Sequence, residues 1–99
     1  MMKRSKHIII SEILDICKTG ANKTRIVYQA NLNFNNVNPY IDLLIKNNLL
    51  VVKPGKNVLY KTTDKGISFL DNFNQINSYF LNNEEADRRI QSIILNQEA

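Results

Sequence analysis

The 99-residue chain contains one cysteine, one histidine, three glycines and no tryptophan. A disulfide needs two thiols, so Cys17 cannot form one within the chain, and its spacing to His7 matches no zinc-binding motif. The glycines form no phosphate-binding loop, and one histidine leaves few groups from which to build a catalytic pocket. We therefore expect no enzyme activity, no catalytic residue, no metal site and no cofactor, and no small-molecule ligand is evident.

Long apolar runs are also absent. The start MMKRSKHIII is basic and then apolar, but Glu12 and Asp15 follow too soon for the apolar core of a signal peptide. No apolar run approaches the ~20 residues that a helix needs to span a bilayer. We therefore expect a soluble cytoplasmic protein with no membrane partner.

The composition fits one small folded domain. Ninety-nine residues suffice for a single core, and 43% apolar with 22% charged residues is usual for a globular protein. No internal repeat, low-complexity segment or flexible linker is evident. Asparagine occurs fifteen times, which can reflect the nucleotide composition of a genome, so a single asparagine carries little weight.

Charge is distributed unevenly along the chain. Residues 1–65 contain eleven Lys or Arg and four acidic residues, a net charge of +7, whereas residues 66–99 contain two and five, a net charge of −3. The basic part therefore holds the candidate surface for a polyanion, unless its lysines are merely solvated, which is equally common in small basic proteins. Lys3, Arg4 and Lys6 form either a loose basic arm or, as we prefer, only a solubilising end, because termini are usually mobile.

Two helices are predicted before residue 31. Residues 6–18 carry a broad apolar stripe that includes Cys17, with Ser5 as a cap and Gly20 just past the end. The three consecutive isoleucines in this segment could instead form a strand, but the later apolar repeats favour a helix. A second helix over residues 23–30 is too short to be stable alone, so it must pack on its neighbours.

A third helix is predicted over residues 34–47, with Asn33 or Asn35 as its cap. Its inner sector contains Val37, Ile41, Leu44 and Ile45, and its outer sector contains Asn35, Asn36, Pro39, Asp42 and Lys46. Pro39 cannot donate the backbone bond to Asn35, which predicts a kinked or irregular first turn. Alternatively, the helix starts at Asn38 and Pro39 takes the favoured first position.

A β-hairpin and a long helix complete the chain. The β-prone runs 49–53 and 58–62 flank Pro54-Gly55, which predicts a hairpin with Lys53 and Lys56 near its tip. The helix that follows, capped by Thr63, has apolar residues that step by alternating four and three positions, as in a coiled-coil seam. These residues predict a dimer interface of Phe69, Phe73, Ile76, Phe80, Ile90 and Ile94.

Polar residues 82–87 interrupt that seam, which leaves two arrangements open. A single helix over residues 63–96 would be about 50 Å long, too long for so small a domain to cover. Alternatively, Asn82 or Asn83 caps a separate helix that folds back. Either arrangement leaves more apolar surface than one small domain needs, which predicts a homodimer.

Three helices, a hairpin and a long helix, in this order, are typical of a winged helix domain with a C-terminal extension. One α-helix fits the major groove of DNA, cations and helix N-termini bind phosphates, and asparagine can bond an adenine edge in two places. The predicted DNA-binding residues are Lys23, Thr24, Arg25, Asn35, Asn36, Asn38, Lys53 and Lys56. Each asparagine alone fits a capping or solvated role better than a base contact, but we expect at least one of them to contact a base.

The runs KTRIVYQANLNF, YIDLLIKNNLL and YKTTDKGISFL together resemble the archaeal winged helix-turn-helix family of small DNA-binding proteins, which includes the chromatin proteins of the ten-a type. The resemblance covers about residues 6–76. It implies a homodimer, joined by an antiparallel coiled coil of C-terminal helices, that binds double-stranded DNA in the nucleoid. It also implies DNA-facing surfaces from Asn35 to Tyr40, at Lys23 and Arg25, and at the wing lysines Lys53 and Lys56.

The predicted fold class is mainly α with a small β-hairpin. We expect a winged helix-turn-helix domain over residues 1–66 and a dimerising helix, or helix pair, over residues 67–99. The predicted function is double-stranded DNA binding as a homodimeric transcriptional regulator or an archaeal chromatin protein. The alternative is a winged domain that binds only another protein, because a fold does not dictate function.

Overall fold

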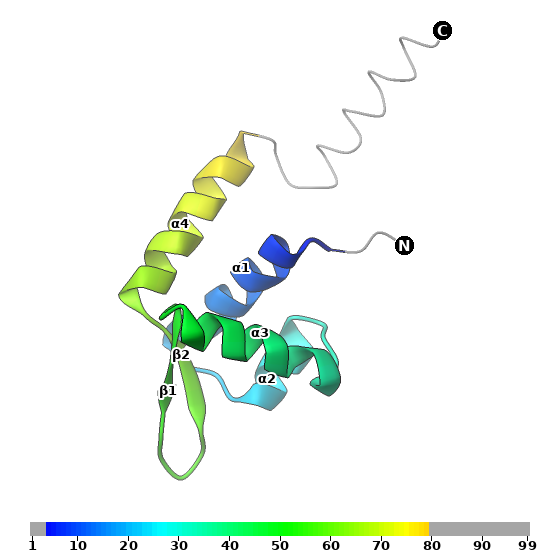
Figure 1. The fold of residues 1–99 in the computed structure, drawn as a ribbon, viewed down its shortest axis with the longest axis vertical. Coiled ribbons are helices and arrows are strands. Elements are labelled where there is room, and N and C mark those ends of the chain that lie inside the picture. Colours follow the sequence, from blue (N-terminus) through cyan, green and yellow to red (C-terminus); the bar gives the residue numbers. More distant parts are fainter. Residues whose placement is uncertain (1–3, 80–99) are drawn as a thin grey trace, which may run out of the picture.

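The structure, a computed structural model, describes residues 4–79. Its elements are α1 (Lys6–Ile16), a 3₁₀ turn η1 (Cys17–Thr19), α2 (Lys23–Gln29), α3 (Phe34–Lys46), β1 (Leu50–Lys53), β2 (Leu59–Thr62) and α4 (Asp64–Ser78). This order confirms the predicted mainly helical fold with one small antiparallel hairpin. In Figure 1 the hairpin projects from the helices toward one end, and α4 runs beside α1 toward the other.

Polar side chains cap all four of these α-helices, at Ser5 and Thr63 as predicted, at Asn33 rather than Asn35, and at Asn22. The side chains of Ser5, Asn22, Asn33 and Thr63 accept hydrogen bonds from the backbone N–H groups of Ile8, Arg25, Asn36 and Gly66, at 3.2, 2.8, 2.8 and 3.0 Å. Each bond satisfies one of the free donors in the first turn of a helix. The bond to Asn33 also decides where α3 begins, because it places the first helical residue at Phe34.

Pro39 therefore lies inside α3, and the helix continues through it. In the first turn the carbonyl oxygen of Asn33 accepts from both Asn36 and Val37, each at 3.1 Å, a shared arrangement that is common at helix ends. Pro39 has no N–H group, so the carbonyl of Asn35 loses its usual helical partner. Both residues are exposed, and water can satisfy that carbonyl.

The core lies between α1, α2 and α3, and the hairpin base and α4 close it. Its buried apolar residues are Ile10, Ile13, Leu14, Cys17, Ala21, Ile26, Val27, Ala30, Val37, Ile41, Leu44, Leu50 and Leu70. Cys17 is a core residue, as predicted, and burial raises the pKa of its thiol to about 12 despite an opposing effect of the Arg25 charge. The thiol is therefore protonated at neutral pH and is poorly suited to redox or nucleophilic chemistry.

Backbone hydrogen bonds join the hairpin to the segment before α2. Its register pairs Leu50 with Thr62 and Lys53 with Leu59. Ala21 extends the ladder, since its N–H and carbonyl both bond to the backbone of Tyr60, at 3.0 and 2.8 Å. These bonds hold the segment before α2 against β2, so the hairpin and α2 have a defined relative position.

The start of α4 is packed closely against the end of α3. A Cβ added at Gly66 would lie only 2.4 Å from the carbonyl oxygen of Leu49 and 2.6 Å from Cγ2 of Thr62. Lys65 donates from Nζ to the carbonyl of Asn47 at 3.0 Å. Because α4 continues without a break across residue 66, the predicted division between residues 66 and 67 falls within a helix and stays a prediction.

Candidate nucleic-acid interface

The outer face of α3 consists of three polar residues and one proline. Residues Asn35, Pro39, Asp42 and Lys46 are all exposed, and their spacing of four, three and four positions puts them on one side of the helix. We call these four residues the outer stripe. The opposite side is filled by the buried Val37, Ile41 and Leu44. The core thus fixes which side of α3 faces outward.

A polar hollow lies between the start of α2 and the wing, which we define as residues 50–62. Its volume is about 470 Å³, and its lining residues are Asn22, Lys23, Thr24, Lys56, Asn57, Val58 and Tyr60. Three predicted site residues, Lys23, Thr24 and Lys56, therefore meet there although they are far apart in the sequence. The Ala21–Tyr60 backbone bonds described above hold the two walls together. Two ammonium groups beside one open hollow suit an anionic group such as a phosphate.

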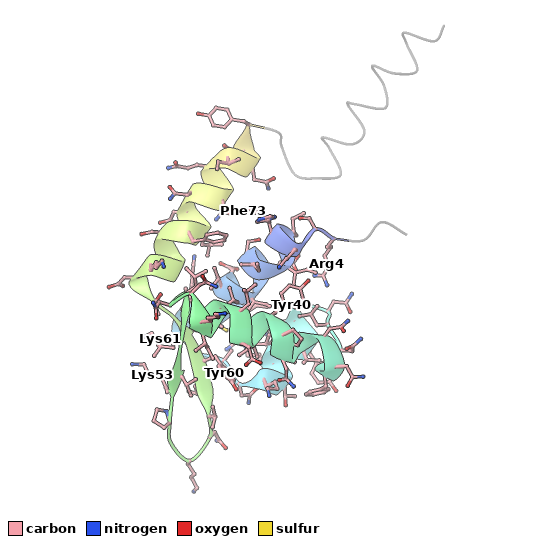
Figure 2. The ribbon with its side chains drawn as sticks, viewed as in Figure 1. Arg4, Tyr40, Lys53, Tyr60, Lys61 and Phe73 are labelled. Atoms are coloured by element: carbon pink, nitrogen blue, oxygen red, sulfur yellow. The ribbon has the colours of Figure 1, made fainter. Side chains whose placement is uncertain are left out.

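Lys53 lies on the other face of the hairpin. Side chains alternate between the two faces of a strand, so Val52 and Tyr60 share one face while Lys53 and Lys61 share the other. Figure 2 shows Tyr60 on the side of α2 and the two lysines on the opposite side. Lys53 is thus separated from the hollow that contains Lys56, and Lys61 is a cation that the sequence analysis did not select.

Asn36 and Tyr40 line a second, more apolar hollow between α1 and α3. Its volume is about 610 Å³, and Lys6, Ile9, Leu32, Pro39 and Leu43 complete its lining. Figure 2 shows Tyr40 on the side of α3 that is turned toward α1. The predicted polar residues of α3 are therefore divided, with Asn35 on the outer stripe, Asn38 exposed on the flank away from α1, and Asn36 and Tyr40 beside α1.

Two arginines hold local structure in place. Arg25 is exposed, but its Nη1 lies 3.4 Å from the carbonyl oxygen of Gly20, so it is directed toward the segment before α2. Arg4 forms an ion pair with Glu12 and donates to the carbonyl oxygen of Asn31 at 3.0 Å. Arg4 is neither a loose arm nor only a solubilising residue, because it ties α1 to the turn between α2 and α3.

The predicted dimer residues occupy different environments on α4. Phe69 packs against the core, and Phe73 is half-buried and directed from α4 toward α1 (Figure 2). Ile76 is 61% exposed, and Tyr79 beyond it is 85% exposed. The other predicted members, Phe80, Ile90 and Ile94, lie outside the described residues.

Residues 4–79 contain neither a cluster of metal ligands nor a membrane-spanning helix. No three His, Cys, Asp or Glu side chains in this range come together as a metal ion would require. No helix in it combines the length and the apolar character needed to cross a membrane.

Similarity to known proteins gives an independent view of this arrangement. Residues 3–80 match a family model described as winged helix-turn-helix. An uncharacterised protein of Methanocaldococcus jannaschii is 51% identical over 49 residues, which are 48% of this chain and 50% of that protein. The chain thus spans about half the length of that curated relative.

Solved structures with the same fold include a protein of known binding partner. Sso10a-2, a DNA-binding protein from Sulfolobus solfataricus, superposes with a TM-score of 0.76 over 91% of this chain and 96% of that one, at 24% identity. The structure of hsRosR-S1 superposes with a TM-score of 0.61 over 90% of this chain and 88% of that one, at 16% sequence identity. BpsR of Bordetella bronchiseptica superposes with a TM-score of 0.53 over 98% of this chain and 76% of that one, at 17% sequence identity. The DNA binding of BpsR is regulated by 6-hydroxynicotinic acid. At these identities the likeness concerns the fold alone.

Proposed function

This chain belongs to the winged helix-turn-helix family, and we propose that it binds double-stranded DNA with the outer face of α3, the start of α2 and the wing. The observation that carries this proposal is the hollow in which Lys23 and Thr24 of α2 meet Lys56 of the wing. The outer stripe of α3 supplies the polar surface that a major groove accepts. Phosphates held at the hollow would position α3, and base edges would meet its exposed side chains.

The other predicted site residues take secondary roles in this proposal. Asn35 and Asn38 are exposed on α3 and can reach a base edge, whereas Asn36 and Tyr40 lie nearer to α1 and suit the flanking backbone. Lys53 approaches phosphate from the outer face of the wing, and Arg25 supports the segment that carries Lys23.

We further propose that the protein acts as a homodimer, as a transcriptional regulator or an archaeal chromatin protein. The DNA-binding function of Sso10a-2 and the match to an archaeal relative agree with this role. Support for the dimer comes from Ile76 and Tyr79, which are apolar or aromatic and exposed on α4. Two copies would also double the modest number of cations that one copy offers to DNA.

Duplex binding is tested with the whole chain by titration of a labelled DNA duplex at several salt concentrations. We expect the affinity to fall steeply as the salt concentration rises. The double substitution Lys23→Ala with Lys56→Ala should reduce the affinity. It should also reduce the slope of log affinity against log salt concentration by about one for each phosphate contact that is lost. Lys18→Ala is the matched control, because Lys18 lies outside the hollow and 3.3 Å from Asp15. Absence of duplex binding at low salt would favour the alternative, a winged domain that binds only protein.

The homodimer is tested by sedimentation of the Ile76→Asp variant. A charge at this exposed position leaves the domain folded but disfavours an apolar interface, so we expect a shift from dimer to monomer. Gln75→Asp adds the same charge at the neighbouring exposed position and should leave the dimer intact. An unchanged mass for Ile76→Asp would place the interface elsewhere.

A further inference from the structure

One acidic residue stands alone among the cations of the central part of the chain. Between residues 16 and 63 the only acidic residue is Asp42, whereas the cations are Lys18, Lys23, Arg25, Lys46, Lys53, Lys56 and Lys61. Asp42 is exposed on the outer stripe of α3, flanked by Pro39 and Lys46. A carboxylate there repels phosphate, so it weakens binding to DNA of arbitrary sequence.

The fold makes no evident use of this carboxylate. The ion pairs within residues 4–79 are Arg4 with Glu12 and Lys18 with Asp15, and Asp42 takes part in neither. No side-chain hydrogen bond in the same range involves Asp42, which lies well inside α3 and caps neither end. Its oxygens therefore remain free to accept hydrogen bonds from a partner.

A carboxylate has a preferred partner in the major groove, because the adenine N6 amino group, the other donor there, lies beside the N7 acceptor of the same base. Ionised Asp can only accept hydrogen bonds, and the cytosine N4 amino group is a donor that Asp or Glu side chains bind there. Guanine offers acceptors at the corresponding edge, which Asp42 would repel. One residue can thus attract one base pair and disfavour others, which is how specificity is built from both attraction and repulsion.

We infer that Asp42 is a specificity-determining residue that selects a cytosine in the DNA site. This inference rests on the proposed DNA binding and adds that binding is sequence-selective rather than only electrostatic. Asn35 and Pro39 lie on the same stripe and would face neighbouring base pairs, where Asn suits adenine and an apolar ring suits the methyl group of thymine. The assignment rests on Asp42, because an ionised carboxylate only accepts hydrogen bonds and cytosine N4 is the donor that Asp and Glu bind in the major groove.

The experiment is a binding selection from random duplexes with three versions of the 99-residue chain: the wild type, Asp42→Ala and Asp71→Ala. Asp71 is an exposed acid on α4, so its substitution changes the net charge equally but leaves the outer stripe unaltered. We expect the wild type and Asp71→Ala to enrich one motif with a fixed C·G pair. Asp42→Ala should lose the preference at that pair and bind the wild-type motif about 5- to 30-fold less selectively over unrelated duplexes.

Three results would overturn the inference, and they can be told apart. If Asp42→Ala enriches the unchanged motif and only binds every duplex more tightly, Asp42 acts by repulsion alone. If the wild type binds duplexes without enriching a motif, DNA binding stands but Asp42 selects no base. If the wild type binds no duplex at low salt, the proposed function fails as well. Circular dichroism of Asp42→Ala checks that this exposed substitution leaves the fold intact.

Discussion

Helices α3 and α4 bury their apolar residues to very different degrees. α3 packs Val37, Ile41 and Leu44 fully into the core and leaves a polar outer stripe, with Phe34 at its start as the one large apolar residue that is more than half exposed. α4 has fifteen residues, but only Gly66 and Leu70 are buried, and Ile76 and Tyr79 near its end are mostly exposed.

The difference indicates which kind of partner each helix can accept. The polar outer stripe of α3 is stable in water and gains from charged or hydrogen-bonding groups, as DNA provides. Exposed apolar surface on α4 gains about 25 cal/mol for each Å² that a partner covers, which favours another protein surface. The proposed nucleic-acid face and the proposed protein face thus lie on different helices, and each can be perturbed separately.

The largest expected effect comes from the buried face of α3. Leu44→Ala should lower the free energy of unfolding by about 2–5 kcal/mol, because Leu44 is fully buried and its loss leaves a cavity. Ile76→Ala should lower the free energy of unfolding only slightly in dilute protein. It should lower this free energy more in concentrated protein, where a second copy would cover α4 in the proposed dimer. Denaturant unfolding at two protein concentrations measures both variants. A concentration-independent loss of several kcal/mol for Ile76→Ala would assign Ile76 to the domain core.

An intermediate effect is expected where α4 meets the end of α3. Gly66→Ala should destabilise the domain by about 1–3 kcal/mol, because the new methyl group would clash with the backbone of Leu49. Gly55→Ala is the matched control, since its nearest contact would be an ordinary 3.7 Å from the carbonyl oxygen of Asn57. Thermal unfolding compares the two, and equal stabilities would mean that α4 shifts away without loss.

The smallest effects on stability are expected from two of the four helix caps, Asn33 and Thr63. Asn33→Ala and Thr63→Ala should each lower the free energy of unfolding by about 0.5–2 kcal/mol, because each removes the side-chain acceptor of a first-turn N–H group. Thr63→Ala should destabilise the domain more than Asn33→Ala, because Thr63 Oγ1 also donates to the carbonyl of Asn48 at 2.6 Å. Asn33→Ala should additionally weaken duplex binding, whereas Thr63→Ala should not. A reversed order of stabilities would show that the Thr63–Asn48 bond contributes nothing.

Local features were predicted well because they depend on neighbours in the chain. The caps at Ser5 and Thr63, the helical order and the hairpin follow from the side chain of one residue and the spacing of the next few. The sequence does not decide the start of α3, because Pro39 fits either the first position of a helix or an irregular interior position. The structure places it inside α3, where the cap at Asn33 and the buried Val37 already set the first turn.

The sequence by itself determined the element order, the caps at Ser5 and Thr63, the core role of Cys17 and the basic character of the first 65 residues. Only the tertiary structure decided which of the predicted residues meet. It joined Lys23 to Lys56, put Lys53 on the opposite face of the hairpin, and turned Asn36 and Tyr40 toward α1. It also placed Asp42 at the centre of an exposed stripe. The reason is physical: periodicity predicts which face of an element is apolar, whereas packing between distant elements sets the neighbours of each polar side chain.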